Sequence, residues 1–239
     1  MKLLFVSESD AAKFKSQVRV GIVGTAVREG CEVTIESIDL DDIRTAIKEL
    51  GIERPTPVIN ADEGEPSVYV ICLAAEDEGL EYGAWINANQ GEYEISDDID
   101  SLLACSPAEE DLKGWEVENS RNFEDIEVSG DDADDIGELG RAIAEHGEAF
   151  VLFYKNNPVK EPYRKVVSQF NREFKKYYTS ENAFVSEMLN EDGTLEKLSE
   201  VGLNINCLDL ETVLTEKYKY NDGFSFLSGE KNGIYVFES

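Results

Sequence analysis

The sequence is poor in the residues that catalytic and metal sites most often use. It holds one histidine, His146, in 239 residues. A single histidine disfavours a hydrolase triad, and a histidine at the end of an expected helix is explained by its interaction with the helix dipole. The four cysteines, Cys31, Cys72, Cys105 and Cys207, form no C-x-x-C pair, so neither a zinc site nor a redox motif is expected. These shortages predict a protein that is not an enzyme and has no cofactor and no metal.

Long hydrophobic runs are also missing. The first apolar segment, Met1–Val6, is interrupted by Ser7, Glu8 and Asp10. Such a segment is too short for a signal peptide or for a helix that spans a membrane. The sequence therefore predicts a cytoplasmic protein without membrane contact.

Basic residues are scarce in one part of the chain. Residues 63–154 hold 26 acidic residues against only Lys113, Arg121 and Arg141, which is a net charge of −23. Residues 1–62 and 155–239 each carry a net charge of −3, and the whole chain carries −29. A chain with this charge repels polyphosphate, so direct binding to nucleic acid is not expected. A charged partner should be basic.

The acidic stretch has the pattern of a folded domain. It keeps nine aromatic residues, from Tyr69 to Tyr154, and shows apolar periodicity between its charges. A solubilising acidic tail would lack both, and halophilic adaptation would acidify the whole chain. A rigid array of carboxylates can release anions from a basic groove as duplex DNA does, with its one charge per roughly 1.7 Å of axis. The composition thus favours a decoy for DNA.

Hydrophobic periodicity and turn residues predict an α+β protein built of small modules. We expect boundaries that divide the chain into residues 1–62, 63–154 and 155–239, the first of them at the polar junction Asp62–Pro66. The expected strands are 2–6, 32–38, 55–59, 67–73, 82–86, 114–117 and a terminal hairpin of 220–224 with 234–237. The expected helices are 11–29, 41–50, 97–103, 134–146, 180–189 and 208–217.

The first unit has a βαβ-like order that weakly resembles a thioredoxin-like or glutaredoxin-like half-domain. The chemistry of that family needs a thiol of low pKa after the first strand, where this chain has Ser7-Glu8-Ser9-Asp10. Cys31 is the one cysteine in the unit. The alternative of a thioredoxin-like oxidoreductase would need a reactive thiol near that strand, so we expect a unit without redox activity.

Specific strings in residues 66–239 resemble the ArdA family of antirestriction proteins. Those of the opening part are Val68-Tyr69-Val70, Gly79, Gly83-Ala84-Trp85-Ile86, Ser106-Pro107 and Glu109-Glu110. Those of the later part are Glu145-His146-Gly147-Glu148-Ala149-Phe150, Tyr178-Thr179-Ser180, Ala183-Phe184 and Gly233-Ile234-Tyr235-Val236-Phe237. The departures from the family pattern are the extra N-terminal unit and an acidic loop, Glu124–Asp135.

The resemblance implies an elongated chain of small α/β modules that forms a homodimer. It also implies a DNA mimic that occupies the basic DNA-binding groove of a Type I restriction-modification complex. The alternative is a decoy that inhibits another DNA-binding host defence or nucleoid protein. Trp85 and Trp115 are either exposed partner anchors or, as we prefer, parts of a core or dimer interface.

The candidate partner-binding residues are carboxylates that would take the places of phosphates. For any one of them a solvated surface is explanation enough, and helix capping accounts for one or two, so the signal is collective. The aspartates from Asp131 to Asp135 lack the spacing and the glycine of an EF-hand loop, so a calcium site is not expected. The candidates are Glu76, Asp77, Glu78, Glu92, Glu94, Asp97, Asp98, Asp100, Glu109, Glu110, Asp111, Glu116, Glu118, Glu124, Asp125, Glu127, Asp131, Asp132, Asp134 and Asp135.

Overall fold

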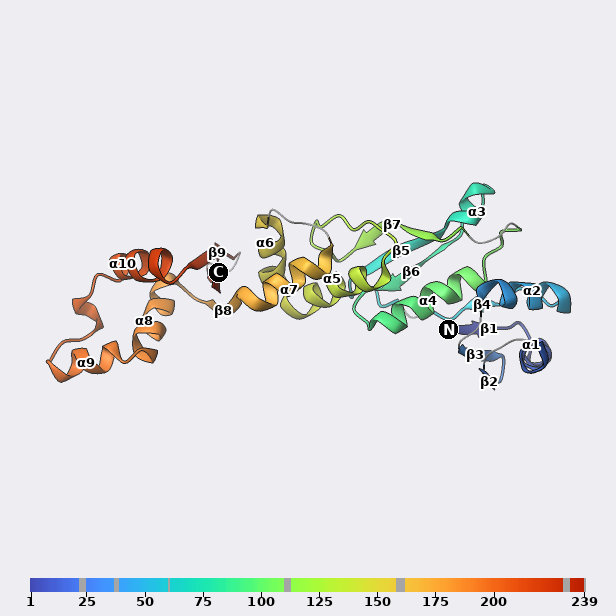
Figure 1. Ribbon diagram of the computed structural model, residues 1–239, viewed down its shortest axis with the longest axis horizontal. Helices are drawn as coiled ribbons and strands as arrows, with labels where there is room; N and C mark the ends of the chain where they lie inside the picture. The colour runs from blue at the N-terminus through green and yellow to red at the C-terminus, as the bar shows by residue number, and fades with distance from the viewer. Residues whose placement is uncertain are drawn as a thin grey trace. The chain divides into compact units, whose positions relative to one another are not determined.

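The chain forms two compact units, Met1–Glu145 and His146–Ser239, in a computed structural model (Figure 1). Each unit contains both helices and strands, which confirms the α+β class. The three-part division predicted from composition stays a prediction. The structure describes residues 1–21, 25–36, 39–59, 61–109, 113–157, 162–229 and 233–238.

Residues 1–59 form a four-stranded sheet packed with two helices. In chain order the elements are β1 (Lys2–Leu4), α1 (Glu8–Gly21), β2 (Thr25–Glu29), β3 (Glu32–Glu36), α2 (Leu40–Leu50) and β4 (Thr56–Pro57). The sheet order is β2-β3-β1-β4, and each neighbouring pair is antiparallel. Alternation along the strands and the 3.6-residue period of the helices bury one shared core that includes Leu3, Phe14, Val33 and Ile43.

The topology of this sheet corrects the βαβ prediction. The predicted strands 2–6 and 32–38 correspond to β1 and β3, which pair in antiparallel orientation because the unpredicted strand β2 follows α1 and turns the chain back. β1 and β2, which flank α1 in the chain, are separated by β3. This βαββαβ order with a split βαβ is that of ferredoxin-like folds. The predicted thioredoxin-like unit is not confirmed. The sequence pattern indicated the elements, but the pairing of strands far apart in the chain decides the fold.

The helix predicted for residues 11–29 is wrong at both ends. It begins earlier because Ser7 caps it: the Ser7 hydroxyl accepts the N–H of Asp10 at 3.1 Å and donates to the Asp10 carboxylate at 2.8 Å. It ends at Gly21, and β2 follows with the β-branched residues Thr25 and Val27. Gly30, with φ of 62°, forms the turn of the β2–β3 hairpin instead of a helix stop.

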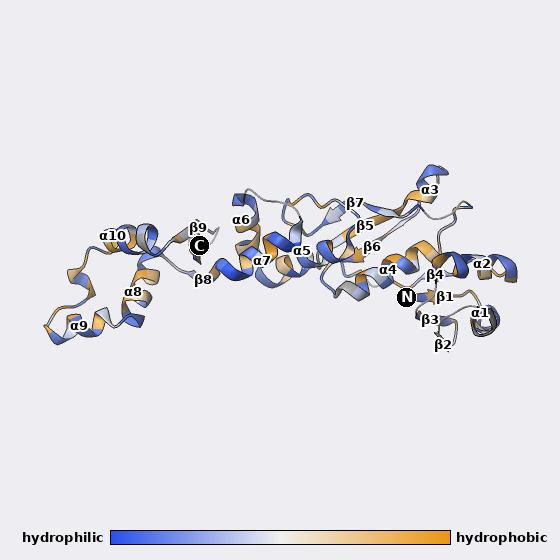
Figure 2. Ribbon diagram, viewed as in Figure 1, coloured by the Kyte–Doolittle hydropathy of each residue, from blue (hydrophilic) through white to orange (hydrophobic). Residues whose placement is uncertain are grey.

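The acidic stretch contributes a second, three-stranded sheet to the first unit. Its elements are β5 (Ser67–Cys72), α3 (Leu73–Asp77), β6 (Gly83–Asn87), α4 (Glu92–Ala104), β7 (Trp115–Arg121) and α5 (Ala133–His146). The sheet order β6-β5-β7 is antiparallel, and α4 runs along it (Figure 1). The predicted strands and the helix 134–146 are confirmed, whereas α4 is longer than the predicted helix and α3 was missed. The central strand is the most hydrophobic of the three (Figure 2).

The two sheets of the first unit are joined through α4. Ala104 and Cys105 belong to the core of residues 1–59, and the half-buried Tyr82 packs against it. Tyr82 also donates its hydroxyl hydrogen to the carbonyl oxygen of Leu102 at 3.1 Å. The N-terminal subdomain therefore has a fixed place on the acidic module.

Helix α5 packs through two glycines. A Cβ atom at Gly137 would lie 2.7 Å from the side chain of Ile95, and one at Gly140 would lie 2.5 Å from the carbonyl oxygen of Ala88. The absence of side chains on this face of α5 lets the helix approach the backbone that follows β6. The sequence showed these glycines but not their contact.

The second unit combines helices with a three-stranded antiparallel sheet of order β8-β10-β9. Ser180, where the predicted helix 180–189 begins, caps α8, since its hydroxyl accepts the N–H of Ala183 at 3.1 Å. The terminal hairpin is formed by β9 and β10, but its first strand lies later than the predicted 220–224, because the chain is π-helical up to Asn221. The predicted helix 208–217 is divided between α10 and this π-helical turn. The elements are α6 (Glu148–Asn156), α7 (Tyr163–Glu173), β8 (Phe174–Tyr178), α8 (Glu181–Glu191), α9 (Thr194–Glu200), η1 (Ile205–Cys207), α10 (Leu210–Val213), η2 (Leu214–Asn221), β9 (Phe224–Ser228) and β10 (Ile234–Glu238).

Candidate partner-binding surface

The three basic residues of the acidic stretch each contact another side chain of the protein. Lys113 pairs with Asp77 at 2.9 Å, and Arg141 pairs with Glu138 at 2.8 Å. The guanidinium of Arg121 lies over the Trp85 ring, 4.5 Å from its centroid. The bases therefore serve local contacts, and most of the carboxylates around them keep their charge unbalanced.

Most of the candidate carboxylates lie on the surface. Glu78, Asp98, Asp100 and Asp134 are half-buried, and Glu110, Asp111 and the side chain of Glu92 lie outside the described residues. The exposed ones are Glu76, Asp77, Glu94, Asp97, Glu109, Glu116, Glu118, Glu124, Asp125, Glu127, Asp131 and Asp132.

Asp135 is a correction to the predicted set. This residue is only 8% exposed, so its carboxylate cannot face a partner as the other candidates can. It lies in the first turn of α5, where the adjacent Ile136 enters the core. Asp132 caps the same helix, since its carboxylate accepts the N–H groups of Asp134 and Asp135, each at 3.1 Å.

Some of the exposed carboxylates hold the fold together. The carboxylate of Asp97 lies 3.2 Å from the amino group of Met1, and that of Glu109 lies 3.6 Å from Lys48 Nζ. The half-buried carboxylate of Glu78 accepts the backbone N–H of Glu109 at 2.8 Å. Contacts between charged groups at the surface contribute little individually, but they occupy the oxygens that a partner would otherwise use.

Six exposed candidates have no hydrogen-bond or ion-pair partner among the residues that the structure describes. They come from α3, α4, β7 and the segment between β7 and α5, so each is fixed on a folded part of the chain. We call them the open carboxylates: Glu76, Glu94, Glu116, Glu118, Glu124 and Asp131.

The acidic loop, Glu124–Asp135, is anchored by apolar side chains just before it and within it. Phe123 and Ile126 are buried, whereas Glu124, Asp125 and Glu127 between and after them are exposed. Glu124 and Asp125 have positive φ angles of 51° and 64°, a backbone conformation that residues other than glycine rarely adopt. Backbone strain of this kind persists where the surrounding contacts over-determine it. The loop therefore presents its acids from a fixed backbone.

Two aspartates of α4 lose solvent, and the charge of the amino terminus offsets the effect of burial on their pKa values only in part. Burial raises the pKa of Asp98 and of Asp100, and the charge of Asp97 raises that of Asp100 further. Asp98 accepts a hydrogen bond from Gln90 at 2.8 Å. Asp100 has no such partner within the described ranges. Its ionised form therefore costs stability.

Replacing Asp100 by asparagine should stabilise the fold at pH 7. A carboxylate whose folded pKa is raised costs stability above that pKa, and the cost fades as the pH falls toward its ordinary value of 3.8. The gain of Asp100→Asn should therefore be present at pH 7 and absent at pH 3, measured as the urea midpoint. The exposed Glu94→Gln on the same helix is the control, and an equal gain from both variants would refute the assignment.

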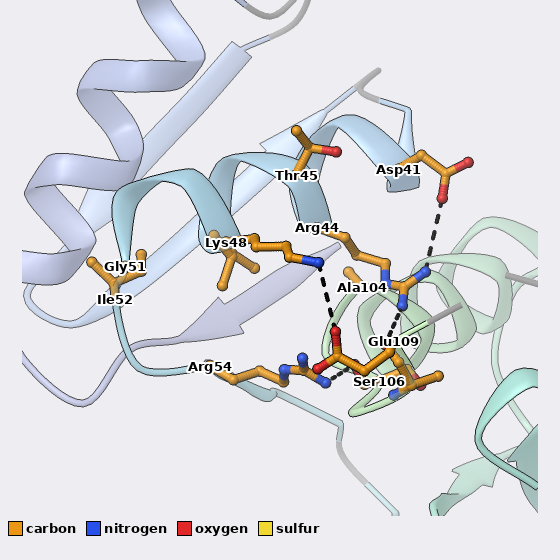
Figure 3. A pocket seen from close by; sticks show the side chains of 12 residues that line it. Asp41, Arg44, Thr45, Lys48, Gly51, Ile52, Arg54, Ala104, Ser106 and Glu109 are labelled. Carbon is orange, nitrogen blue, oxygen red and sulfur yellow. Dashed lines mark hydrogen bonds and ion pairs between the residues drawn. The ribbon is translucent and has the colours of Figure 1, made fainter. Parts of the chain in front are cut away.

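Three bases of the N-terminal subdomain face the acidic module, which the sequence did not indicate (Figure 3). Arg44 of α2 donates to the carbonyl oxygen of Ala108 at 2.6 Å, and Arg54 donates to that of Ser106. Lys48 is the partner of Glu109. These side chains line a pocket of about 410 Å³ between α2 and the segment after α4. Arg44 and Arg54 thus fasten the extra subdomain to the acidic module through backbone carbonyls and not through its carboxylates.

Of the cysteines, only Cys207 is exposed. Cys72 and Cys105 are buried, and burial raises the pKa of the Cys105 thiol to about 12. Cys31 is half-buried in the β2–β3 turn. The His146 ring packs 4.8 Å from that of Phe170. In the described part of the chain, no three metal-ligating side chains gather and no helix could cross a membrane.

The comparisons with known proteins agree with the resemblance seen in the sequence. Residues 68–224 match the family described as antirestriction protein (ArdA). No curated protein and no solved structure matches the chain. The match covers well over half of the 239 residues and begins inside β5, so the ferredoxin-like subdomain lies outside it. The chain therefore belongs to the ArdA family of antirestriction proteins.

Proposed function

We propose that this antirestriction protein is a DNA mimic, which inhibits a Type I restriction-modification enzyme by occupying its basic DNA-binding groove. The observation that carries the proposal is the set of open carboxylates, held on folded elements of a stretch whose net charge is −23. Catalysis has no part in this mechanism. The protein acts by binding.

The free energy of such binding has the same source as that of DNA. A basic groove holds counter-anions when it is empty, and an array of fixed negative charges releases them. Because the open carboxylates lie on helices, a strand and an anchored loop, little conformational entropy is lost when they are ordered by the target. Long side chains on a disordered tail would lose more.

The same charge makes a direct contact with nucleic acid unfavourable, so the target itself is the partner. We propose that the protein acts in the cytoplasm, where the enzyme is, and as a homodimer. The ferredoxin-like subdomain, held through Arg44 and Arg54, adds a surface to the acidic module that the family match does not include. That surface is a means of choosing among related targets.

The proposal is tested by displacement. A purified Type I methyltransferase is bound to a fluorescently labelled duplex that carries its recognition site, and the full-length protein is titrated in. Fluorescence anisotropy should fall to the value of free DNA, with inhibition of methylation over the same concentration range. Inhibition with the duplex still bound would mean that the protein acts at another surface.

A further inference from the structure

A small pocket beside the acidic sheet has a lining suited to one cationic side chain. Its volume is about 470 Å³, and it lies among β5, β7, α3 and the segment that leads into β6. We propose that it binds the guanidinium group of an arginine from the target. The inference rests on the proposed function and adds a defined contact to the array of charges. The lining residues are Tyr69, Ile71, Glu76, Gly79, Leu80, Glu81, Tyr82 and Glu118.

Tyr69 forms the flat wall of the pocket. Its ring lies against the backbone of Gly83, where a Cβ atom would be 2.9 Å from two of the ring atoms. Gly83 pairs with Ile71 across the strands, so the glycine makes the space that the ring occupies. Ile71 is buried below, and Leu80, 40% exposed, stands at the side. A planar cation can therefore lie on an aromatic face with apolar atoms around it.

Three carboxylates surround this wall. Glu76 comes from α3, Glu81 from the turn before β6, and Glu118 from β7, and all three are exposed. None has a hydrogen-bond or ion-pair partner in the described part of the chain. No lysine or arginine is among the described residues of the lining. The pocket thus combines an aromatic face with converging negative charge, which a lone acidic cluster would not.

The neighbouring ring already carries a guanidinium from the protein itself. Trp85 lies opposite Tyr69 in the sheet, and the two ring centroids are 5.4 Å apart. Arg121 stacks on Trp85, with its guanidinium carbon 4.5 Å from the ring centroid. The sheet face therefore offers two aromatic surfaces of the same kind, and an internal arginine lies on one of them. The pocket leaves the other for an arginine from outside.

Arginine suits this pocket better than lysine. Its guanidinium is planar, stacks on an aromatic face and donates several hydrogen bonds in one plane, so Tyr69 and two carboxylates can engage it together. A lysine ammonium is a compact, strongly hydrated charge that gains less from the ring. The DNA-binding groove of the target is a source of such side chains.

The test uses N-acetyl-arginine amide as the probe and N-acetyl-citrulline amide as its neutral match. Each is titrated into the full-length protein at low salt and followed in ¹H–¹⁵N spectra. The arginine probe should shift the amide signals of Tyr69, Leu80 and Glu118 in a saturable way, and the citrulline probe should not. Shifts spread evenly over the acidic surface would overturn the proposal.

Variants separate the pocket from the general charge. Glu118→Gln should weaken binding of the arginine probe roughly threefold, whereas Glu116→Gln, on the same strand but outside the pocket, should leave it unchanged. Tyr69→Leu, which changes no charge, should also weaken it roughly threefold, and Tyr69→Phe should restore it. Equal effects of Glu116→Gln and Glu118→Gln, or no effect of Tyr69→Leu, would contradict a built site.

The same variants in the displacement assay distinguish this inference from the proposed function. If Tyr69→Leu and Glu118→Gln displace the duplex as well as the parent protein does, the pocket has no role although the mimicry stands. If the parent protein does not displace the duplex at all, the proposed function fails, while the titration with the arginine probe still reports on the pocket.

Discussion

Neutralising four open carboxylates outside the pocket should weaken displacement of DNA from a Type I enzyme about 30-fold at low salt. The variant carries Glu94→Gln, Glu116→Gln, Glu124→Gln and Asp131→Asn. Each exposed pair across the interface is expected to contribute roughly 0.5 kcal/mol, and about 1.4 kcal/mol corresponds to a factor of ten. The change is measured as the concentration of protein that displaces half of the labelled duplex.

A variant with the same change of charge elsewhere is the control for this prediction. Glu191, Glu196, Glu200 and Glu211 are exposed in the second unit, outside the stretch of highest charge. Their conversion to glutamine should weaken displacement no more than about threefold, because the net charge changes while the open carboxylates stay in place. Equal losses in the two variants would show that net charge, and not the placement of the open carboxylates, determines the affinity.

The replacement Gly140→Ala should destabilise the first unit by about 2 kcal/mol. Alanine within a helix is normally favoured over glycine by roughly 1 kcal/mol. Here the added Cβ would meet the carbonyl oxygen and the Cβ of buried Ala88 at 2.5 Å, and a contact with backbone cannot be relieved by rotating a side chain. Overpacking typically costs about 1–3 kcal/mol, and a clash with backbone belongs at the upper end, so the net loss is about 2 kcal/mol and the sign is reversed. The free energy of unfolding is obtained from urea denaturation.

Gly64→Ala is the matched control, since the added Cβ would meet only the Asp62 carboxylate at 3.5 Å, an ordinary contact. It should leave the urea midpoint nearly unchanged. A Gly140→Ala protein as stable as the parent would show that α5 can move away from Ala88. In that case the glycines of α5 have no packing role.

Local patterns predicted the elements better than their pairing. The helix 134–146 and the last strand, 234–237, have clear periodicity, so α5 and β10 were found from the sequence, whereas the first strand of the hairpin was placed too early. The fold of residues 1–59 was not, because β3 inserts between β1 and β2 through contacts that no local pattern contains. The strand β2 was predicted as part of the helix 11–29 for a related reason, since its apolar residues continue the hydrophobic periodicity of α1. Pairing with β3 decided that these residues form a strand and not a helix.

The charge map located the candidate surface, but not the state of each carboxylate. The sequence placed the acids in residues 63–154 and predicted that this stretch is folded. The buried Phe123, just before the acidic loop, and Ile126, within it, agree with this. Burial of Asp135 and the capping role of Asp132 depend on how α5 packs, and this packing cannot be predicted from amino-acid composition. The wall of the pocket at Tyr69 depends on pairing between β5 and β6.

The central claim is that this protein competes with DNA for one basic groove. It is tested most directly by displacing a labelled duplex from a Type I methyltransferase with the full-length protein at several salt concentrations between 50 and 200 mM. Competition through released anions predicts full displacement. It also predicts that the logarithm of the affinity falls steeply and linearly with the logarithm of the salt concentration. A duplex that stays bound to the inhibited enzyme, or an affinity indifferent to salt, would contradict the account.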